Sequence, residues 1–570
     1  MHRPNPLLGA LVGLLAGAAI SGIFWFAFHL LGLAFVPFDI FDAMARVLPG
    51  PVITFGIDTM VNMLILLNFD VAETAKTAEH LMAVGAFLAT LTVAGGLLFL
   101  VFGRTEQEQE SSNTGLLVGA VMGVALALIT INFNVGSTAP VFLSAAWILA
   151  GVTAWGFTVE RSYRALSVPA TESEGAKEAE TGEEVSTEGI KVGEDLTLVQ
   201  QSRRRFLLTM GGTSAAISLV GAGLGAIAAN RREAAIAEQI AASAESGPDE
   251  VDGESEGEFD ADALRQEAIE LPNANASVEP VPGTRLEYTP LEDHYRIDIS
   301  TVPPTIIGSN WVLPITGLVA NPLELTLNDL KTRYEPREEF VTLACISNRI
   351  AGNLISTILW TGASLREILA DAGPLESARY LIIHSADGFH ETVDLELINL
   401  DERIMLAYFW DRQPLPRRNG FPLRIWIPNR YGMKQPKWIT EMEVVAEYEP
   451  GYWVARNWDE DAFMRATSVI DTVEQIDDET VGIGGIAHAG DRSISQVQVR
   501  IDGGEWQDAE LRDPLSNATW VIWRYEWTFE AGSHSFEVRC VEGDGTPQIE
   551  AVASPRPSGA TGIHRVTETL

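Results

Sequence analysis

A lone cysteine opens the stretch Cys345-Ile346-Ser347-Asn348-Arg349, directly after the apolar and β-branched run Phe340-Val341-Thr342-Leu343-Ala344. Such a run predicts a buried strand, so the thiol stands where a strand ends and a loop begins. A free cysteine in that setting is commonly a small buried hydrophobic residue, and the alternative is a thiolate that binds a metal. Only one other cysteine, Cys540, is present, so no disulfide framework is available and the neighbouring residues must decide.

Outward from this stretch, residues 286–460 have the texture of a mixed α/β domain. Short β-branched and aromatic runs predict four strands and Leu365–Ala372 predicts a helix; the strands are Trp311–Leu318, Glu339–Ala344, Tyr380–His384 and Leu423–Ile427. Residues 461–570 alternate with period two between regularly spaced turns, which favours an immunoglobulin-like β-sandwich. Its predicted strands are Val481–Ala487, Gln496–Ile501, Trp520–Phe529 and His534–Cys540, and Cys540 is expected to pack inside.

Residues 1–160 form an apolar region in which we expect four transmembrane helices. A span needs about 20 apolar residues, and the candidates are Leu7–Val36, Leu81–Phe102, Leu116–Ile131 and Val141–Phe157, followed by a fifth at Phe206–Ala229. The tendency of positive residues to stay inside places His2, Arg3, Arg104 and Arg161 in the cytoplasm. Four spans return the chain to the cytoplasm at Arg161 only if Val52–Phe69 does not cross the membrane. We therefore expect Val52–Phe69 to be an interfacial or re-entrant segment, and a further span is the alternative.

The fifth apolar segment is preceded by Ser202-Arg203-Arg204-Arg205-Phe206-Leu207, which resembles a twin-arginine export signal. The alternative is an ordinary cluster of cytoplasmic positive charges beside a span. We interpret 202–230 as a signal or transmembrane helix, with cleavage after Ala228 left open. Residues 161–201 and 231–285, which include the acidic stretches Ala170–Leu196 and Glu233–Glu270, are expected to be flexible linkers. Everything beyond them is then expected outside the cytoplasmic membrane.

The formal net charge of −38 argues against a nucleic-acid partner, because phosphate binding needs clusters of Lys and Arg that this sequence lacks.

Several separated blocks after Cys345 resemble, in the same order, the sulfite oxidase family of molybdopterin oxidoreductases. Besides the cysteine stretch these are Leu406-Ala407-Tyr408, Pro414–Arg417, Asn419-Gly420-Phe421-Pro422-Leu423-Arg424 and Tyr431–Trp438. The resemblance runs from about residue 286 to the C-terminus. It implies a molybdopterin-binding domain with Cys345 as the metal ligand, and a dimerisation domain after it, hence a possible homodimer.

The same resemblance assigns roles to individual residues. It implies that Cys345, Arg349 and Tyr408 are catalytic, Arg349 as a permanent cation suited to an oxyanion and Tyr408 close to the metal. Arg, Lys, Asn and backbone N–H groups are also the donors that a phosphate and a pterin ring require. The implied cofactor-binding residues are Tyr295, Arg296, Asn348, Ser385, Asn419, Arg424, Gln435, Pro436 and Lys437. The alternatives left open are a surface position for Tyr295 and Arg296 and a core position for Tyr408.

The activity implied is oxygen-atom transfer on sulfite or a related sulfur compound, with electrons passed to a separate cytochrome or quinone. The sequence contains no CxxCH haem site, and only His29 and His80 in the membrane region offer axial ligands, so haem is not expected. Asn419 stands where many sulfite oxidases have His, as in the branch that reduces methionine sulfoxide in periplasmic proteins, which keeps a sulfoxide reductase open. A third hypothesis, of another class, is a non-enzymatic exported adhesion or sensing module.

Overall fold

The computed structural model describes residues 4–67, 71–103, 113–133, 136–167, 192–245, 265 and 267–570. These residues form two compact units. The first comprises Met1–Leu48, Lys76–Ala235 and the three residues Ser300–Val302. The second comprises Pro49–Ala75, Ile236–Ile299 and Pro303–Leu570, so both units are built from discontinuous stretches of chain.

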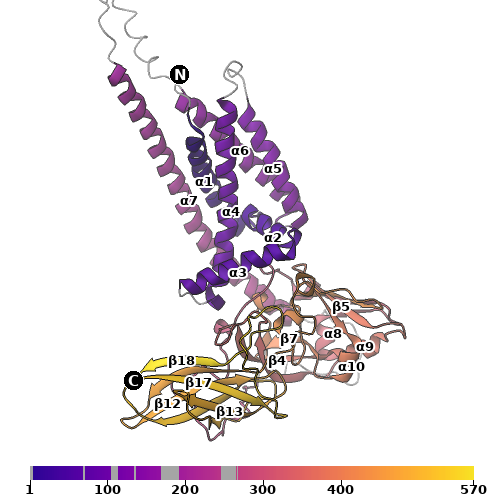
Figure 1. Cartoon of the computed structure of the whole chain (residues 1–570). Helices are drawn as coiled ribbons and strands as arrows, with labels where there is room; N and C mark the ends of the chain where they lie inside the picture. The colour runs from indigo at the N-terminus through magenta and orange to yellow at the C-terminus, as the bar shows by residue number, and fades with distance from the viewer. Residues whose placement is uncertain are drawn as a thin grey trace, which may run out of the picture. The chain divides into compact units, whose positions relative to one another are not determined.

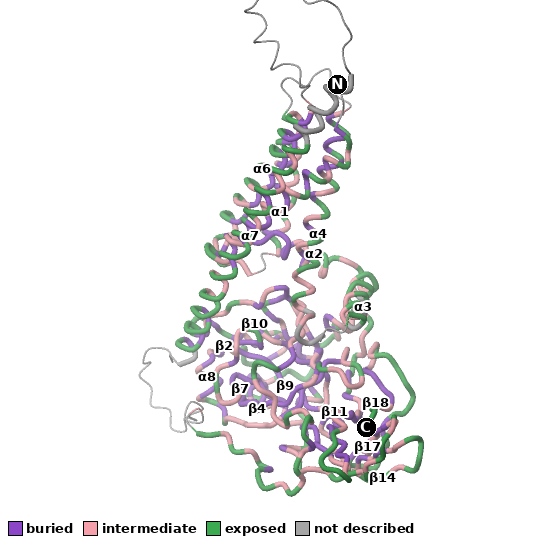
Figure 2. The backbone as a smooth tube through the Cα atoms, turned by 90° about the vertical axis from the view of Figure 1, so that its left-hand side faces the viewer, coloured by how far each residue is buried: buried purple, intermediate pink, exposed green. Residues whose placement is uncertain are grey.

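The first unit is helical. Five helices are long and apolar enough to cross a membrane, judged by length and composition: Pro6–Leu31, Lys76–Phe102, Thr114–Phe133, Val141–Ser167 and Arg204–Ser243. Large apolar side chains such as Leu97, Val121 and Leu128 are exposed along them, as is expected of residues that face lipid. Figure 2 shows exposed positions along much of α6 and α7. The helices are α1 (Pro6–Leu31), α2 (Val36–Val47), α4 (Val71–Phe102), α5 (Thr114–Phe133), α6 (Val141–Ser167) and α7 (Val192–Glu245).

Small residues bring these helices together. A Cβ on Gly156 of α6 would lie 2.1 Å from the carbonyl oxygen of Gly115 on α5, and a Cβ on Gly95 of α4 would lie 2.5 Å from the carbonyl of Gly9 on α1. Backbones can approach this closely only where side chains are absent, which is a common arrangement of membrane helices. Helices α5 and α6 accordingly run side by side in Figure 1.

Two membrane predictions are refined by the structure. The predicted span Leu7–Val36 is wrong at its end, because α1 stops at Leu31 and Gly32 takes a left-handed conformation with φ 67° before α2 begins. The doubtful segment Val52–Phe69 is the separate 17-residue helix α3 (Gly50–Leu66), which is not among the five long helices; Phe69 itself lies outside the described residues.

The predicted flexible linkers are helical at 161–167, 192–201 and 231–245, and the structure describes residues 267–285 as turns and irregular chain. Helix α6 continues to Ser167, and α7 begins at Val192 and runs without interruption to Glu245, so it includes the end of the first acidic stretch and the beginning of the second. Ala, Glu and Gln are strong helix formers, and Ile236 and Ile240, one turn apart, are buried in the core of the second unit. From residue 267 the chain is packed as well, with Asn273 and Val281 buried.

The first part of the second unit contains two five-stranded sheets. One has the order β2-β1-β10-β5-β6, with β1 and β10 parallel and the other pairs antiparallel. The other is antiparallel, with the order β3-β4-β7-β8 and β9 paired to β7. The elements are β1 (Val312–Gly317), β2 (Leu323–Thr326), α8 (Leu327–Thr332), β3 (Arg337–Ala344), β4 (Ile355–Ser364), α9 (Leu365–Ala372), β5 (Tyr380–Ser385), β6 (His390–Asp394), α10 (Leu395–Leu400), β7 (Met405–Trp410), β8 (Gln413–Pro414), β9 (Arg424–Trp426) and β10 (Ile439–Val445). Short 3-10 turns precede, interrupt and follow this series: η4 (Leu291–Asp293), η5 (Gly308–Asn310), η6 (Arg417–Asn419), η7 (Gly432–Lys434) and η8 (Val454–Arg456).

The second part contains two four-stranded antiparallel sheets that share one apolar core. Their orders are β11-β12-β16-β15 and β14-β13-β17-β18, and both contribute to the core through Ile483, Val497, Trp523 and Phe536. Cys540 is fully buried there, which confirms its predicted place. The strands are β11 (Thr467–Gln475), β12 (Thr480–His488), β13 (Ile494–Ile501), β14 (Gln507–Asp508), β15 (Glu510–Leu511), β16 (Val521–Thr528), β17 (Ser533–Glu542) and β18 (His564–Thr569).

Candidate cofactor site

Cys345 follows the last residue of β3 in a tight turn. Its N–H donates to Leu354 O at 2.9 Å, and its own carbonyl accepts from Asn348 N–H at 3.0 Å. The side chain is 8% exposed, and Sγ lies 3.0 Å from Ser347 Oγ. Burial raises the pKa of the Cys345 thiol, whereas Ser347 and the charge of Lys437 lower it. The sulfur is therefore buried among polar groups as well as apolar ones.

Tyr295 links the cysteine to the predicted pterin-binding stretch. Its N–H donates to Ser356 Oγ at 3.2 Å, which holds the segment before β1 against β4. Burial raises the pKa of Tyr295; the nearby Cys345 raises it further, and Arg424 opposes the rise. Tyr295 thus lies close to both the thiol and the guanidinium.

Arg424, the first residue of β9, is a buried cation that forms no ion pair with a carboxylate of the described residues. Its Nη1 donates to the carbonyl of Asn419 at 3.1 Å and its guanidinium lies 4.7 Å from the ring centre of Trp360. Within the described residues it makes no ion pair, and burial lowers its pKa to about 10. A buried charge with no counter-charge is strongly unfavourable, so the position favours an anionic ligand.

Lys437 brings a second cation to the same place. Residues Arg424 and Lys437 pair as an isolated antiparallel bridge, and Lys437 Nζ binds Asp298 Oδ2 at 3.1 Å and Ile297 O at 3.2 Å. Burial lowers the pKa of Lys437 to about 8 in spite of Asp298. Arg296 contacts the same carboxylate oxygen, with Nε 2.7 Å from Asp298 Oδ2.

Several buried polar atoms along this stretch have no hydrogen-bond partner within the part of the chain that the structure describes. They are His294 Nε2, Ser385 Oγ, Asn419 Oδ1, Arg424 Nε and Gln435 Oε1. Strand pairing places Ser385 opposite Ile439, and Ala386 N–H donates to Trp438 O at 2.9 Å, beside Lys437. Pro436 O accepts from Ile425 N–H at 3.2 Å, which fixes the loop against β9. Buried polar groups are normally satisfied, so this set fits a polar, anionic cofactor that supplies the missing partners.

For three predicted residues, the observed positions do not by themselves support the predicted role beside the Cys345 thiol. Arg349 is exposed on the turn that follows the cysteine. Asn348 serves its own loop, since its Oδ1 accepts from Leu354 N–H at 3.1 Å. Tyr408 is 1% exposed within β7 and packs edge-on against Phe409 with ring centres 5.0 Å apart, which is the core position left open from the sequence.

The structure also adds residues that sequence reasoning missed. His294 stacks on Tyr295 with ring centres 5.1 Å apart and an interplanar angle of 14°, and burial lowers its pKa to about 3. Ser347 touches the thiol and Asp298 bridges Arg296 and Lys437. Their positions within two residues of Cys345 or Arg296 could have identified these residues as candidates. The pattern of apolar residues does not identify them.

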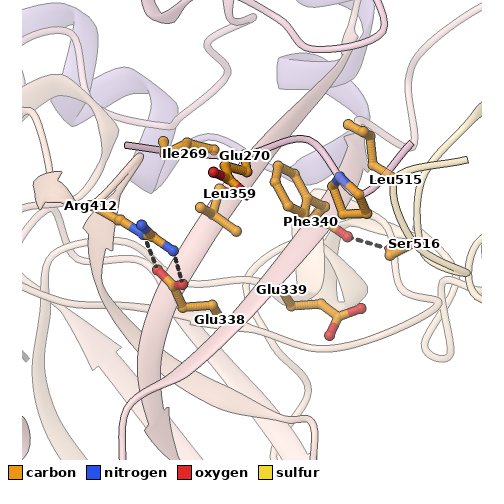
Figure 3. A pocket seen from close by; sticks show the side chains of 10 residues that line it. Ile269, Glu270, Glu338, Glu339, Phe340, Leu359, Arg412, Leu515 and Ser516 are labelled. Carbon is orange, nitrogen blue, oxygen red and sulfur yellow. Dashed lines mark hydrogen bonds and ion pairs between the residues drawn. The ribbon is translucent and has the colours of Figure 1, made fainter. Parts of the chain in front are cut away.

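A separate cavity of about 290 Å³ lies elsewhere in the second unit. It is lined by residues including Glu338, Phe340, Arg412 and Ser516, with Arg412 paired to Glu338 and the hydroxyl of Ser516 bound to Phe340 O (Figure 3). None of the predicted site residues lines it.

Comparison with known proteins shows where this architecture recurs. Residues 300–453 match the model of the oxidoreductase molybdopterin-binding domain. An uncharacterized oxidoreductase of Bacillus subtilis, YuiH, is 32% identical over 149 residues, which cover 25% of this chain and 70% of that protein. The chain belongs to the sulfite oxidase family of molybdopterin oxidoreductases. Mitochondrial sulfite oxidase of mouse is 27% identical over 277 residues, which cover 40% of this chain.

As a member of the sulfite oxidase family, the chain is an oxidoreductase whose molybdopterin domain implies a molybdenum cofactor. The hypothesis of a non-enzymatic adhesion or sensing module is therefore wrong. The match spans 50% of the mouse protein's length. Among solved structures, the sulfane dehydrogenase SoxCD of Paracoccus pantotrophus aligns over 57% of this chain and 96% of that chain, with 18% identity and a TM-score of 0.44.

Proposed function

We propose that this chain is a membrane-anchored molybdenum-cofactor enzyme that transfers an oxygen atom to or from sulfite or a related sulfur compound. The observation that carries the proposal is Arg424, a buried guanidinium without a carboxylate among the described residues, close to Tyr295, which in turn lies close to the Cys345 thiol. A thiolate suits a soft metal in a high oxidation state, and the cations suit the phosphate of a pterin cofactor.

When bound, the cofactor would supply oxygen-atom transfer coupled to two electrons. Cys345 would be its metal ligand, and the protein would hold the organic part through Arg424, Lys437, Asn419, Ser385, Gln435 and the Pro436 backbone. Tyr295 and Arg296 would cover it from the segment before β1. Arg349, on the same turn as the thiol, would attract an oxyanion from solvent, because a guanidinium remains charged at any working pH. Asn348 would shape that turn and Tyr408 would support the metal from the core.

A sulfoxide reductase is the second candidate. It is favoured by one feature, the amide of Asn419, whose Oδ1 has no partner among the described residues and which stands in place of an imidazole. Because a neutral amide adds no positive charge to the site, it suits a neutral S=O group better than an anion.

We further propose that the five apolar helices cross the cytoplasmic membrane and that residues 286–570 function on its outer side. The Arg203-Arg204-Arg205 cluster before the fifth apolar segment supports export by a twin-arginine route. On this proposal residues 286–460 are the catalytic domain, and 461–570 are an immunoglobulin-like dimerisation domain. A separate cytochrome or quinone would exchange electrons with the site.

The decisive experiment combines metal analysis with two assays on purified full-length protein. We expect about one molybdenum per chain, turnover of sulfite with ferricyanide, and loss of both in Cys345→Ser with an unchanged circular-dichroism spectrum. Turnover of methionine sulfoxide with a reduced dye, without sulfite oxidation, would favour the second candidate. Wild-type protein that was purified from cofactor-producing cells and held no molybdenum would overturn the proposal.

A further inference from the structure

The C-terminal sheets, which are β11 to β18 with their connecting loops, bind the strand that ends at Cys345. Both parts belong to the second unit, and β3 is the end strand of its own sheet. Thr342 N–H donates to Ala518 O at 2.9 Å, and Trp520 N–H donates to Thr342 Oγ1 at 2.9 Å. Ala518 and Trp520 lie in the loop between β15 and β16. This loop therefore holds β3 at a residue that precedes the candidate metal ligand by less than one turn of chain.

The turn after Cys345 packs on the same part of the molecule. Ala351 takes a left-handed conformation with φ 62°, which is uncommon for a residue that has a Cβ. Ile350 and Ala351 are packed against a buried apolar cluster of the C-terminal sheets, which consists of Val469, Ile486, Trp520 and Ile522. Burial of this apolar surface favours the turn. The thiol is thus bounded, before and after it in the chain, by contacts with the C-terminal sheets.

The predicted pterin-binding stretch Tyr431–Trp438 is held at its start by the turn between β12 and β13. Asn429, just before the stretch, has φ 57°, and its Oδ1 accepts a hydrogen bond from Nη1 of Arg492 in that turn. Arg492 Nε in turn binds Glu542 Oε2 on β17 at 2.6 Å. A Cβ on Gly490 would overlap Asn429 Oδ1, so the turn approaches this amide as closely as a glycine allows.

Tyr431 is held by a second loop of the C-terminal sheets. A Cβ on Gly559, in the loop before β18, would lie 2.5 Å from the Tyr431 hydroxyl oxygen. That hydroxyl accepts from Arg465 N–H at 3.1 Å, and Arg465 Nε donates to Ser558 O at 3.0 Å. Burial raises the pKa of Tyr431, and the nearby Cys345 raises it further. The two segments bound by the C-terminal sheets therefore lie close to one another.

We propose that the C-terminal sheets are a working part of the cofactor site: Thr342 and Asn429 are positioning residues through which these sheets hold the cysteine strand and the pterin-binding stretch at a fixed separation. This inference rests on the proposed function for the identity of the ligand. It goes beyond the dimerisation role that the resemblance implied, which requires neither contact. A ligand bound by two segments that are far apart in the sequence needs both to be fixed, because a loosely held site loses the orientation and retention of its ligand.

The test uses full-length protein in detergent or nanodiscs, and its first variant addresses the cysteine strand. Thr342→Val keeps the shape of the side chain and removes the acceptor of Trp520 N–H, whereas Thr342→Ser keeps the hydroxyl. The matched control is Thr361→Val on β4. Thr361 is buried like Thr342, but its hydroxyl donates to Glu338 Oε1 at 3.1 Å, within the same sheet.

The second variant addresses the pterin-binding stretch. Asn429→Gly removes the amide that binds Arg492 and tolerates the left-handed backbone, whereas Asn429→Asp keeps an oxygen acceptor. The matched control is Asn457→Gly, because Asn457 is also left-handed, with φ 66°, and is exposed at the end of η8. This control corrects for the freedom that a glycine adds to the unfolded chain.

We expect hydrogen exchange to accelerate about tenfold or more at 340–347 in Thr342→Val and at 429–435 in Asn429→Gly, with α9 unchanged. Both variants should lose molybdenum several times faster than wild type. Their kcat should fall more than their KM rises, because orientation of the cofactor rather than access of the substrate is impaired. Thr342→Ser, Asn429→Asp and the two controls should behave as wild type.

Unchanged exchange in either test variant, or equal acceleration in its control, would overturn the inference. Faster exchange without faster loss of molybdenum would also overturn it, since the contacts would then only join two parts of the unit. Molybdenum-free wild-type protein would instead overturn the proposed function, and the exchange comparison would still decide whether the C-terminal sheets hold both segments.

Discussion

Arg424 carries a cost when the site is empty, and this cost can be measured. Its guanidinium is buried with no carboxylate partner among the described residues. Replacing such a charge by an apolar side chain of similar size is commonly stabilising. Arg424→Met should therefore raise the thermal unfolding midpoint of cofactor-free protein by a few degrees.

The same substitution should have the opposite effect on the loaded enzyme. Molybdenum retained after dialysis should fall about tenfold or more, because a charge-assisted contact to an anion is lost. Arg424→Lys keeps the charge but not the planar guanidinium, so it should retain an amount of molybdenum between those of wild type and Arg424→Met. A general folding defect would lower both quantities, so opposite signs identify the guanidinium as a ligand for the cofactor.

At residue level, the sequence marks a candidate site where a residue's chemistry is indicated by its neighbours in the chain, and the roles of these residues stay predictions. The structure brings Tyr295, Arg424 and Lys437 together near Cys345, as the resemblance implied. The sequence could not show that Asn348 hydrogen-bonds within its own loop or that Arg349 is exposed. Both features depend on the conformation of residues 345–354. His294 was missed because a single histidine carries no spacing signal.

At the scale of elements, a buried ion pair supports the cofactor loop. Lys434 Nζ in η7 lies 2.6 Å from Glu391 Oε1 on β6, with the two side chains 8% and 0% exposed. Breaking one partner leaves an uncompensated charge, so Glu391→Gln should lower the free energy of unfolding by about 3 kcal/mol. The double variant Glu391→Leu with Lys434→Met should recover most of that loss in urea unfolding. Equal losses in single and double variants would show that packing, not charge, dominates there.

The end of β12 provides a pH-dependent contribution to stability. His488 is 2% exposed, and burial, with Arg492 adding to it, lowers its pKa to about 4. The folded state therefore favours the neutral imidazole, whose contribution is complete above pH 6.5 and is lost as the pH falls towards 4. From pH 8 to pH 5 we expect the free energy of unfolding of the C-terminal sheets to fall by about 2 kcal/mol through this group. His488→Gln should remove that part of the slope in urea titrations followed by tryptophan fluorescence; identical slopes would contradict the assignment.

Elements were predicted best where local pattern and burial agree. Helix α9 has the predicted bounds Leu365–Ala372, and β1, β3, β5 and β9 differ from their predicted ends by one or two residues. The sequence analysis missed the extension of α7 to Glu245, because the composition of an acidic, alanine-rich stretch predicts disorder. The burial of Ile236 and Ile240 in the core of the second unit stabilises the helix there. The end of α1 at Gly32 was also missed, because the residues after Gly32 are as apolar as those before it.

At the scale of the whole molecule, the dominant feature is the excess of 77 acidic over 39 basic side chains. Such a charge opposes compaction, and salt shortens the range of repulsion from about 10 Å at 0.1 M to about 3 Å at 1 M. We expect the unfolding midpoint of the purified protein to rise by several degrees between these concentrations, equally with NaCl and KCl. A midpoint that falls, or that depends on which of the two cations is present, would exclude simple screening.

The uninterrupted course of α7 bears on the proposed export of the enzyme and on the cleavage that the sequence left open. The small-residue triplet Ala226-Ile227-Ala228 lies in the interior of this helix, and its C-terminal turns are seated in the second unit through Ile236 and Ile240. Peptidases cut chain that is exposed in loops or frayed ends rather than wound in a helix. While α7 stays folded, we therefore expect cleavage at this triplet to be suppressed. If the apolar helices are embedded as proposed, the catalytic domain would stay tethered, and an electron partner would have to reach it at the membrane surface.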